Sequence, residues 1–496
     1  MSSLLLASFT PPTVQYSAIA PELFLAGTAL FILLLVALRS KKAIPGIYSL
    51  ITILGSVGSM IASFLLWPSV VSKSYFALDG AISVDGFSIF FFVAIAIAMI
   101  LSAALIDSFL KREGIEFPEL YVLMLLSATG ADLMAAGNDL IVIFLGLEIL
   151  SLPLYVLAAT NAKKLGSTEA AMKYFILGAF SSALFLYGIA LTYGATGSTN
   201  LTVIASFLSS NLVPNDGLLA AGITLLLVGF GFKISLVPFH FWTPDVYQGS
   251  PSPITGFMAS VAKIGGFAAL LRVFMTSFSV MQLDWQPIVA LLAVITLLVG
   301  AVLTIVQKDV KRMLAYSSIS HAGFILLGLE AASGKGVASS LFYLFTYSIM
   351  VIGSFAVVTL VANKGDKRHD LENYRGLSSS RPILAFSFAI LLLAQAGVPF
   401  TTGFFAKFYV LTAQVNAHSY LLAIIAMISA VITAFFYLRL ALVMFSPIPL
   451  SSPNRIKTAI PPGAGIVIGI TVAFTIIFGI LPEPIINFAT HAKLLF

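Results

Sequence analysis

Residues 217–242 read GLLAAGITLLLVGFGFKISLVPFHFW. A helix needs about 20 apolar residues to cross the ~30 Å hydrocarbon core of a bilayer, and this run is long enough. It carries one lysine, Lys233, about two-thirds of the way along, and Pro238 near its end. A charged side chain at mid-bilayer costs at least ~2.5–3.5 kcal/mol. We interpret the stretch as a membrane helix whose lysine has a function.

The composition of the whole chain agrees with this interpretation. Hydrophobic residues make up 59% and charged residues only 9% of the sequence, which is typical of a polytopic membrane protein. The net charge is +6, but the basic residues form short clusters between apolar runs, so we expect no nucleic-acid partner. The chain has no cysteine, no metal-ligand spacing among its histidines and no nucleotide-binding loop. We therefore expect no cofactor and no metal in this chain.

Apolar runs predict an all-α polytopic membrane protein with about 14 transmembrane helices. The expected spans are 21–38, 46–67, 86–106, 119–137, 139–160, 169–193, 217–242, 253–275, 286–306, 313–330, 337–361, 382–414, 419–445 and 463–485. The twelfth span is too long for one straight crossing and has Pro399 near its middle. We expect helix 12 to be broken there, and helix 7 to be broken near Pro238.

A short repeat indicates how these helices are organised. Val237-Pro238-Phe239 in helix 7 recurs as Val398-Pro399-Phe400 in helix 12, each close to a lysine within the span. The match could arise by chance in so apolar a chain. An offset of five crossings is odd, so a true repeat would be inverted. We expect a single membrane domain over 1–496, in which 1–118 holds helices 1–3, 119–275 the first repeat, 286–445 the inverted second repeat, and 463–496 the last helix.

The basic residues also predict an orientation. Most of the 26 Lys and Arg fall in the connections after odd-numbered spans, and the first 21 residues contain neither. By the positive-inside rule we expect a multi-pass protein of the cell (plasma or inner) membrane, with both termini on the outer (periplasmic) side. No removable signal peptide is expected.

Five ionisable residues lie deep within the predicted spans: Glu148, Lys233, Lys263, His321 and Lys407. Such residues are functional by default, and a moving carboxylate beside a buried lysine would switch that lysine between holding and releasing a proton. Histidine suits a relay step because it titrates near neutral pH. Glu148 could instead only neutralise a lysine, and His321 could be a packing residue hydrogen-bonded to neighbouring serines.

Two further residues are more ambiguous. Lys173 lies close to the start of its span, so its long side chain could simply reach the membrane surface. His240 lies near the end of helix 7 and could serve either packing or proton transfer. We keep both as possible members of the pathway.

Four segments resemble the antiporter-like subunits of respiratory complex I, and the similarity covers essentially the whole chain. They are GLEILSLPLY at 146–155, KISLVPFHFWTPDVYQGSP at 233–251, KRMLAYSSISHAG at 311–323 and GVPFTTGFFAK at 397–407. Within that family the residues favour the N type, because Lys407 stands where the M type has glutamate and the chain lacks the long lateral helix of the L type.

The resemblance implies a proton-translocating membrane-arm subunit of an NADH:quinone oxidoreductase that carries no redox group itself. Glu148 would pair with Lys233, and protons would pass from Lys233 to Lys263, through His321, to Lys407 and outward. Flavin, iron–sulfur clusters and quinone would lie in partner subunits. The implied neighbours are the M-type subunit, the small K-, J- and A-type subunits, and lipid.

Two other classes of function remain open. One is a cation/proton antiporter of the Mrp type or the related subunit of a membrane-bound hydrogenase. The other is a membrane scaffold whose charges only lock helices together.

Overall fold

The protein is described by a computed structural model that covers residues 14–38, 46–115, 117–161, 164–211, 216–362, 365–367, 369–447 and 460–495. The described helices are α1(Ala20–Ala37), α2(Ile47–Ser72), α3(Gly86–Glu113), α4(Glu119–Ala136), α5(Leu140–Ala158), α6(Leu165–Thr196), α7(Leu201–Ser210), α8(Asp216–Ile234), α9(Trp242–Gly249), α10(Ser252–Phe257), α11(Lys263–Thr276), α12(Gln282–Ile305), α13(Val310–Glu330), α14(Gly334–Val361), α15(Leu377–Ser380), α16(Pro382–Ala396), α17(Thr402–Asn416), α18(Tyr420–Phe445), α19(Pro462–Ile480) and α20(Glu483–His491). A π-helical turn, η1(Met258–Ala262), joins α10 to α11, and short 3-10 turns are η2(Ser279–Met281) and η3(Leu371–Tyr374). Strands β1(Tyr75–Ala77) and β2(Ile82–Val84) form one antiparallel hairpin.

Twelve of the described helical segments are long and apolar enough to cross a membrane. Two of the expected spans are not among them. The tenth corresponds to α13, which begins with Lys311 and Arg312 and carries several serines, so its hydropathy is low. The twelfth is divided into α16 and α17, each of 15 residues, which are too short to cross alone. The protein is thus an all-helical, multi-pass membrane protein apart from its small hairpin.

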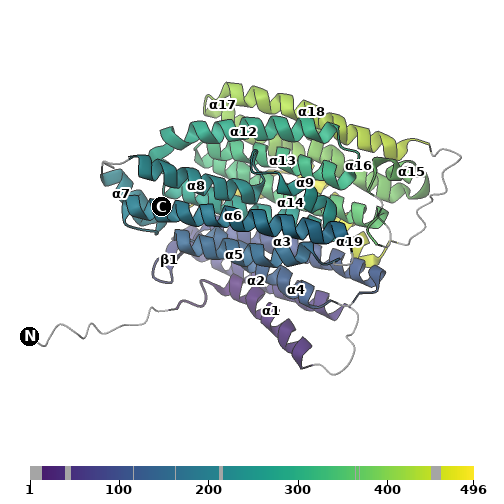
Figure 1. Ribbon diagram of the computed structural model, residues 1–496, viewed down its shortest axis with the longest axis horizontal. Helices are drawn as coiled ribbons and strands as arrows, with labels where there is room; N and C mark the ends of the chain where they lie inside the picture. Colours follow the sequence, from purple (N-terminus) through teal and green to yellow (C-terminus); the bar gives the residue numbers. More distant parts are fainter. Residues whose placement is uncertain are drawn as a thin grey trace, which may run out of the picture.

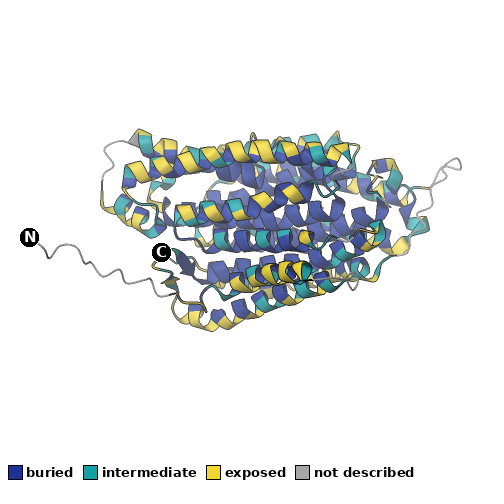
Figure 2. Ribbon diagram, turned by 60° about the horizontal axis from the view of Figure 1, so that its bottom comes forward, coloured by how far each residue is buried: buried dark blue, intermediate teal, exposed yellow. Residues whose placement is uncertain are grey.

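The long helices lie side by side along the long axis of the molecule (Figure 1). The β hairpin and α7 lie at one end, called here the hairpin end, and residues 365–381 with α15 lie at the other, called the loop end. Helix α14 from Gly336 onward and nearly all of the α10–α11 segment are buried. Large apolar side chains such as Leu65, Phe180 and Leu421 are exposed on peripheral helices, and Figure 2 shows exposed residues confined to the outer surface. Such a surface suits contact with lipid.

Both expected helix breaks are present. Between α8 and α9 the chain leaves the helix at Ser235, whose φ is 66°, just before Pro238. Between α16 and α17 it leaves at Gly397, φ 91°, and Phe400, φ 64°, on either side of Pro399. Proline cannot donate a helical hydrogen bond, and positive φ ends the helix, so both breaks follow from local sequence. Each break leaves backbone carbonyls free to bind side chains.

Some elements were not expected from the sequence. The hairpin, α7, α9 and α20 are too short or too polar to stand out in a search for apolar runs. Arg272, which lies near the end of the expected span 253–275, is buried in α11. Its guanidinium donates to both oxygens of Asp85 at 2.9 Å and to the carbonyl of Ala135 at 2.6 Å. It therefore ties α11 to α4 and to the start of α3.

Lys311 falls in the expected connection between the spans 286–306 and 313–330, and it is buried instead. Its ammonium group lies 3.2 Å from Asp366 Oδ2 and donates to the carbonyl of Ser250. Asp366 also accepts hydrogen bonds from the backbone and side chain of Ser252. Burial alone would raise the pKa of the Asp366 carboxyl, but Lys311, His369 and Ser252 outweigh it and hold that pKa well below its usual range. This ion pair fixes the loop end to α10 and α13.

Candidate functional site: a buried row of lysines

Lys233 is the last-turn lysine of α8, and only 4% of it is exposed. Its Nζ donates to Ser151 Oγ at 2.7 Å and lies 5.9 Å from the centre of the Tyr174 ring. The break after α8 positions this ring, because Trp242 at the start of α9 stacks on Tyr174 with centroids 4.4 Å apart. The lysine thus has a neutral hydrogen-bond acceptor and an aromatic face.

Glu148 lies one helical turn before Ser151 on α5, on the same face. Its charge acts on Lys233, yet no direct ion pair joins the two in the described part of the chain. Its Oε1 is buried and has no hydrogen-bond partner among the described residues. Lys233 thus bonds Ser151, and the direct pairing with Glu148 that the resemblance implies is not seen among the described residues.

Lys263 follows the π-helical turn at the start of α11 and is 3% exposed. Its Nζ donates to the carbonyl of Ser318 at 2.5 Å and to Ser318 Oγ at 2.7 Å. A π-turn shifts the side chains that follow it, and such turns are frequent at functional sites. Here the residue immediately after the turn is the lysine that reaches α13.

His321 lies one turn beyond Ser318 on α13 and is also buried. Its Nδ1 is 2.8 Å from the Tyr343 hydroxyl, and its Nε2 is 2.9 Å from the Tyr437 hydroxyl. The Tyr437 hydroxyl also bonds Ser317 Oγ. Two of the neighbouring serines, Ser318 and Ser317, instead bind Lys263 and Tyr437. The sequence analysis did not identify these two tyrosines as part of the site. The only indication in the sequence was that each is a polar aromatic residue within an apolar span.

Lys407 lies in α17, just beyond the second break, and is 6% exposed. Its Nζ donates to the carbonyl of Ala396 at 2.8 Å. In an unbroken helix that carbonyl would accept from the backbone four residues on, so the break frees it for the lysine. The ammonium also lies 5.0 Å from the centre of the Phe324 ring, and that ring stacks with Tyr343. Through Phe324 and Tyr343, Lys407 is therefore connected to His321, which bonds the Tyr343 hydroxyl.

Two glycines leave room beside the lysines of the row, Gly397 in the second break and Gly266 in α11. A Cβ on Gly397 would lie 2.9 Å from Lys407 Cδ, in addition to the strain at its positive φ. A Cβ on Gly266 of α11 would lie 2.6 Å from Ile234 and 3.3 Å from Lys233 Cγ. Close packing of α11 on α8 therefore depends on a residue without a side chain.

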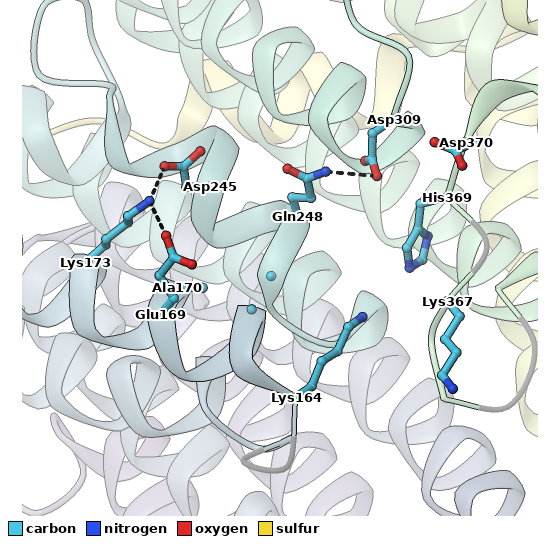
Figure 3. A pocket seen from close by; sticks show the side chains of 12 residues that line it. Lys164, Glu169, Ala170, Lys173, Asp245, Gln248, Asp309, Lys367, His369 and Asp370 are labelled. Carbon is cyan, nitrogen blue, oxygen red and sulfur yellow. Dashed lines mark hydrogen bonds and ion pairs between the residues drawn. The ribbon is translucent and has the colours of Figure 1, made fainter.

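Lys173 does not belong to this row. It lines a polar cavity of about 360 Å³ at the loop end and is bonded to Glu169 Oε1 at 2.7 Å and Asp245 Oδ2 at 2.9 Å (Figure 3). Asp245 also pairs with Arg312 at 2.6 Å. Burial raises the pKa of Asp245, but the two cations outweigh it and hold the pKa below its ordinary value.

His240 lies within the first break, 5% exposed, with its ring 6.5 Å from that of Tyr316. Its Nδ1 has no hydrogen-bond partner among the described residues. It lies beside the row without a hydrogen bond to any of its lysines.

The row places three buried ammonium groups among hydroxyls, carbonyls and aromatic faces, with a histidine and a carboxyl nearby. Such groups can accept and release protons, and they extend through a membrane protein from one helix break to the other. The fold and the site together define an antiporter-like membrane protein whose interior holds a row of buried lysines.

Comparison with known proteins agrees with this class. Residues 137–433 match the family model described as NADH:quinone oxidoreductase/Mrp antiporter, TM. NADH-quinone oxidoreductase subunit N of Parafrankia sp. is 40% identical, with 97% of this chain and 96% of that protein covered. A chain of respiratory complex I from Thermus thermophilus is 33% identical, with a TM-score of 0.78 over 94% of this chain and 98% of that one. The chain belongs to the family of NADH-quinone oxidoreductase subunit N.

The fold itself is shared more widely. A chain of the Mrp complex from Dietzia sp. is only 19% identical but has a TM-score of 0.82, with 97% of each chain covered. At that identity the likeness concerns the fold alone.

Proposed function

We propose that this chain is a proton-translocating membrane-arm subunit of an NADH:quinone oxidoreductase. The observation that carries the proposal is the buried row itself, in which Lys233, Lys263 and Lys407 bond neutral oxygen atoms. Redox chemistry would take place in partner subunits, including those that hold flavin, iron–sulfur clusters and quinone. Membrane neighbours would include the M-type subunit and the small K-, J- and A-type subunits.

The fourteen-helix, inverted-repeat architecture is part of this proposal. Asp139 caps α5 and pairs with Asn200 in an isolated β-bridge, while Asp309 caps α13 and pairs with Asp370 in another. The first bridge precedes α7 at the hairpin end, and the second precedes η3 and α15 at the loop end. Two equivalent caps at opposite ends, five crossings apart, are what inverted repeats would produce. Each repeat would then contribute one broken helix.

The orientation proposed from the sequence places the loop end inside the cell and the hairpin end outside. Lys164, Lys173 and Lys367 lie around the loop-end cavity, and the positive-inside rule counts such basic residues toward the inner side (Figure 3). Both chain termini would then be on the outer side of the plasma membrane.

The polar cavity at the loop end is the proposed point of proton uptake. Glu169, Lys173 and Asp245 would collect protons there, and Tyr174, on the same helix as Lys173, leads to Lys233. Protons would move from Lys233 to Lys263, then through Ser318, His321 and its tyrosines to Lys407 and outward. Glu148 would act as the gate, because its movement relative to Ser151 would change how strongly Lys233 holds its proton.

Reconstituted liposomes test this function. When NADH is added, the assembled complex should acidify the compartment that corresponds to the outside of the cell. Lys233→Ala should abolish the contribution of this subunit to proton translocation. Quinone reduction, measured with an uncoupler present, should persist in that variant. Lys73→Ala is the matched control, because Lys73 is exposed beyond the end of α2 and lies outside both the row and the proposed uptake cavity. Exchange of Na⁺ for H⁺ without the NADH-oxidising arm would support an Mrp-type antiporter. Full coupling in Lys233→Ala and Lys407→Ala variants would support a scaffold.

A further inference from the structure

Two carboxyl groups that the lysine row does not use are buried together at the hairpin end. Glu22 lies in the first turn of α1, and Asp132 lies in the last turns of α4. The two helices pack against each other. Glu22 is 5% exposed and Asp132 is completely buried. The negative charge of Glu22 acts directly on Asp132.

Neither carboxyl group has a partner from another residue in the described part of the chain. All four of their oxygen atoms are buried without a hydrogen bond in the described part of the chain. This sets the pair apart from the other buried acids at this end, since Asp85 accepts from Arg272, Ser88 and Leu495. Two buried carboxyl groups without a hydrogen bond from another residue need a ligand.

The charged groups on the surrounding helices do not meet this need. Helix α11 presents Arg272, but its guanidinium is already bonded to Asp85 and to the carbonyl of Ala135. Lys263, also on α11, is bonded to Ser318, and Glu148 on α5 would add a further negative charge. Beyond the end of α2, Lys73 is exposed. No cation from a packed helix pairs with Glu22 or Asp132 among the described residues.

Electrostatics then identifies the ligand. An isolated carboxylate in a low-dielectric interior is very costly, and two neighbouring carboxylates also repel each other. A metal ion would need more oxygen ligands than two carboxyl groups provide. A proton satisfies the pair with least change, because the protonated carboxyl becomes a donor to the other carboxylate.

We propose that Glu22 and Asp132 form a proton-binding site outside the lysine row, in which the two carboxyl groups hold one proton in common. Protonation converts one carboxylate to a carboxylic acid, and the resulting O–H donates to the remaining carboxylate. Loss of the proton leaves two like charges between α1 and α4. Proton occupancy at this site therefore controls how tightly α1 is held against α4.

Infrared spectroscopy of the full chain in liposomes tests the proposal during a pH titration. The carbonyl band of protonated carboxyl groups should contain a component that the Glu22→Gln/Asp132→Asn double variant lacks at neutral pH. Each single variant should shift the midpoint of the remaining group to lower pH by about one unit or more, because its like-charged neighbour is gone. Asp79→Asn, which removes an exposed acid at the same end, should change nothing.

Two results would overturn the proposal. One is an identical carboxyl band in the wild-type chain and the double variant. The other is a midpoint in each single variant equal to that in the wild type, since the two groups would then titrate independently. If the double variant accumulates poorly, thermal unfolding of the wild type and of the single variant Asp132→Asn gives a second measurement. The melting temperature of the wild type should fall more steeply as pH rises, and equal slopes would contradict a shared proton.

Discussion

Lys263 and Lys311 are both almost wholly buried, yet their partners differ. Lys311 faces the carboxylate of Asp366, whereas Lys263 faces the hydroxyl and carbonyl of Ser318. A carboxylate holds an ammonium in its charged form and locks it in place, but a neutral oxygen solvates the charge without cancelling it. Burial alone therefore does not distinguish the proposed proton carrier Lys263 from the structural Lys311, whereas the hydrogen-bond partner does.

The largest effect should come from breaking the structural pair. Asp366→Asn leaves the ammonium of Lys311 buried without a counter-charge, and we expect a loss of ~3–5 kcal/mol of stability. Thermal unfolding of the purified chain in detergent measures it. Glu372→Gln breaks the exposed pair with Arg375 and should have little effect. Equal losses in the two variants would show that the buried pair is not a structural lock.

The next effect concerns the carrier lysine. Lys263→Ala should lower NADH-driven proton translocation by about 10²-fold through this subunit, the contribution typical of a positioned proton-transfer group. Proton uptake by vesicles containing the assembled complex measures the loss. Lys173→Ala should lower it less, because Lys173 is a partly exposed member of an ion-pair cluster. A larger loss of translocation in Lys173→Ala than in Lys263→Ala would contradict the proposal that a lysine bonded to a neutral oxygen carries the proton.

A smaller effect should follow from moving Lys407 without removing it. In Gly397→Ala the new Cβ would crowd Lys407 Cδ, and the positive φ would cost the alanine about 1–2 kcal/mol. We expect a partial loss of translocation. Gly469→Ala in α19 is the control, because a Cβ there meets no atom within 4 Å. Unchanged translocation in Gly397→Ala would mean that the position of Lys407 is not critical.

The smallest effect is a change with pH. Because the folded protein holds the pKa of Asp366 below its ordinary value, the pair stabilises the fold at any pH above the unfolded value of ~3.9. That stabilisation is lost as the pH falls below this value. The difference in melting temperature between the wild type and Asp366→Asn should thus be constant near neutral pH and shrink in acid. A difference that grows in acid would contradict the direction of the pKa shift.

The sequence predicted those members of the candidate site that can be recognised without knowing their neighbours. Lys233, Lys263, His321 and Lys407 stand out because an ionisable group in an apolar run is costly whatever its neighbours are. The helix breaks at Pro238 and Pro399 were also predicted locally, although proline alone does not decide a break, since Pro153 lies inside the continuous helix α5. The resemblance to complex I subunits also rested on contiguous motifs.

The partners could not be predicted in this way. Ser151, Tyr343 and Tyr437 come from helices far apart in the sequence, and many similar residues elsewhere in the chain have no such role. Asp366 was read as part of a charged connection and is instead buried against Lys311. Sequence distance gives no information about which of these side chains meet.

The sequence by itself thus determined that this is a multi-pass membrane protein with costly charges in its interior and interruptions beside them, because hydrophobicity and backbone geometry are properties of short segments. Only the tertiary structure decided which lysines face neutral oxygens, which face carboxylates, and that Glu22 and Asp132 lie together. The physical reason is that the state of a buried charge depends on the atoms within a few ångströms of it, and helix packing alone brings those atoms there.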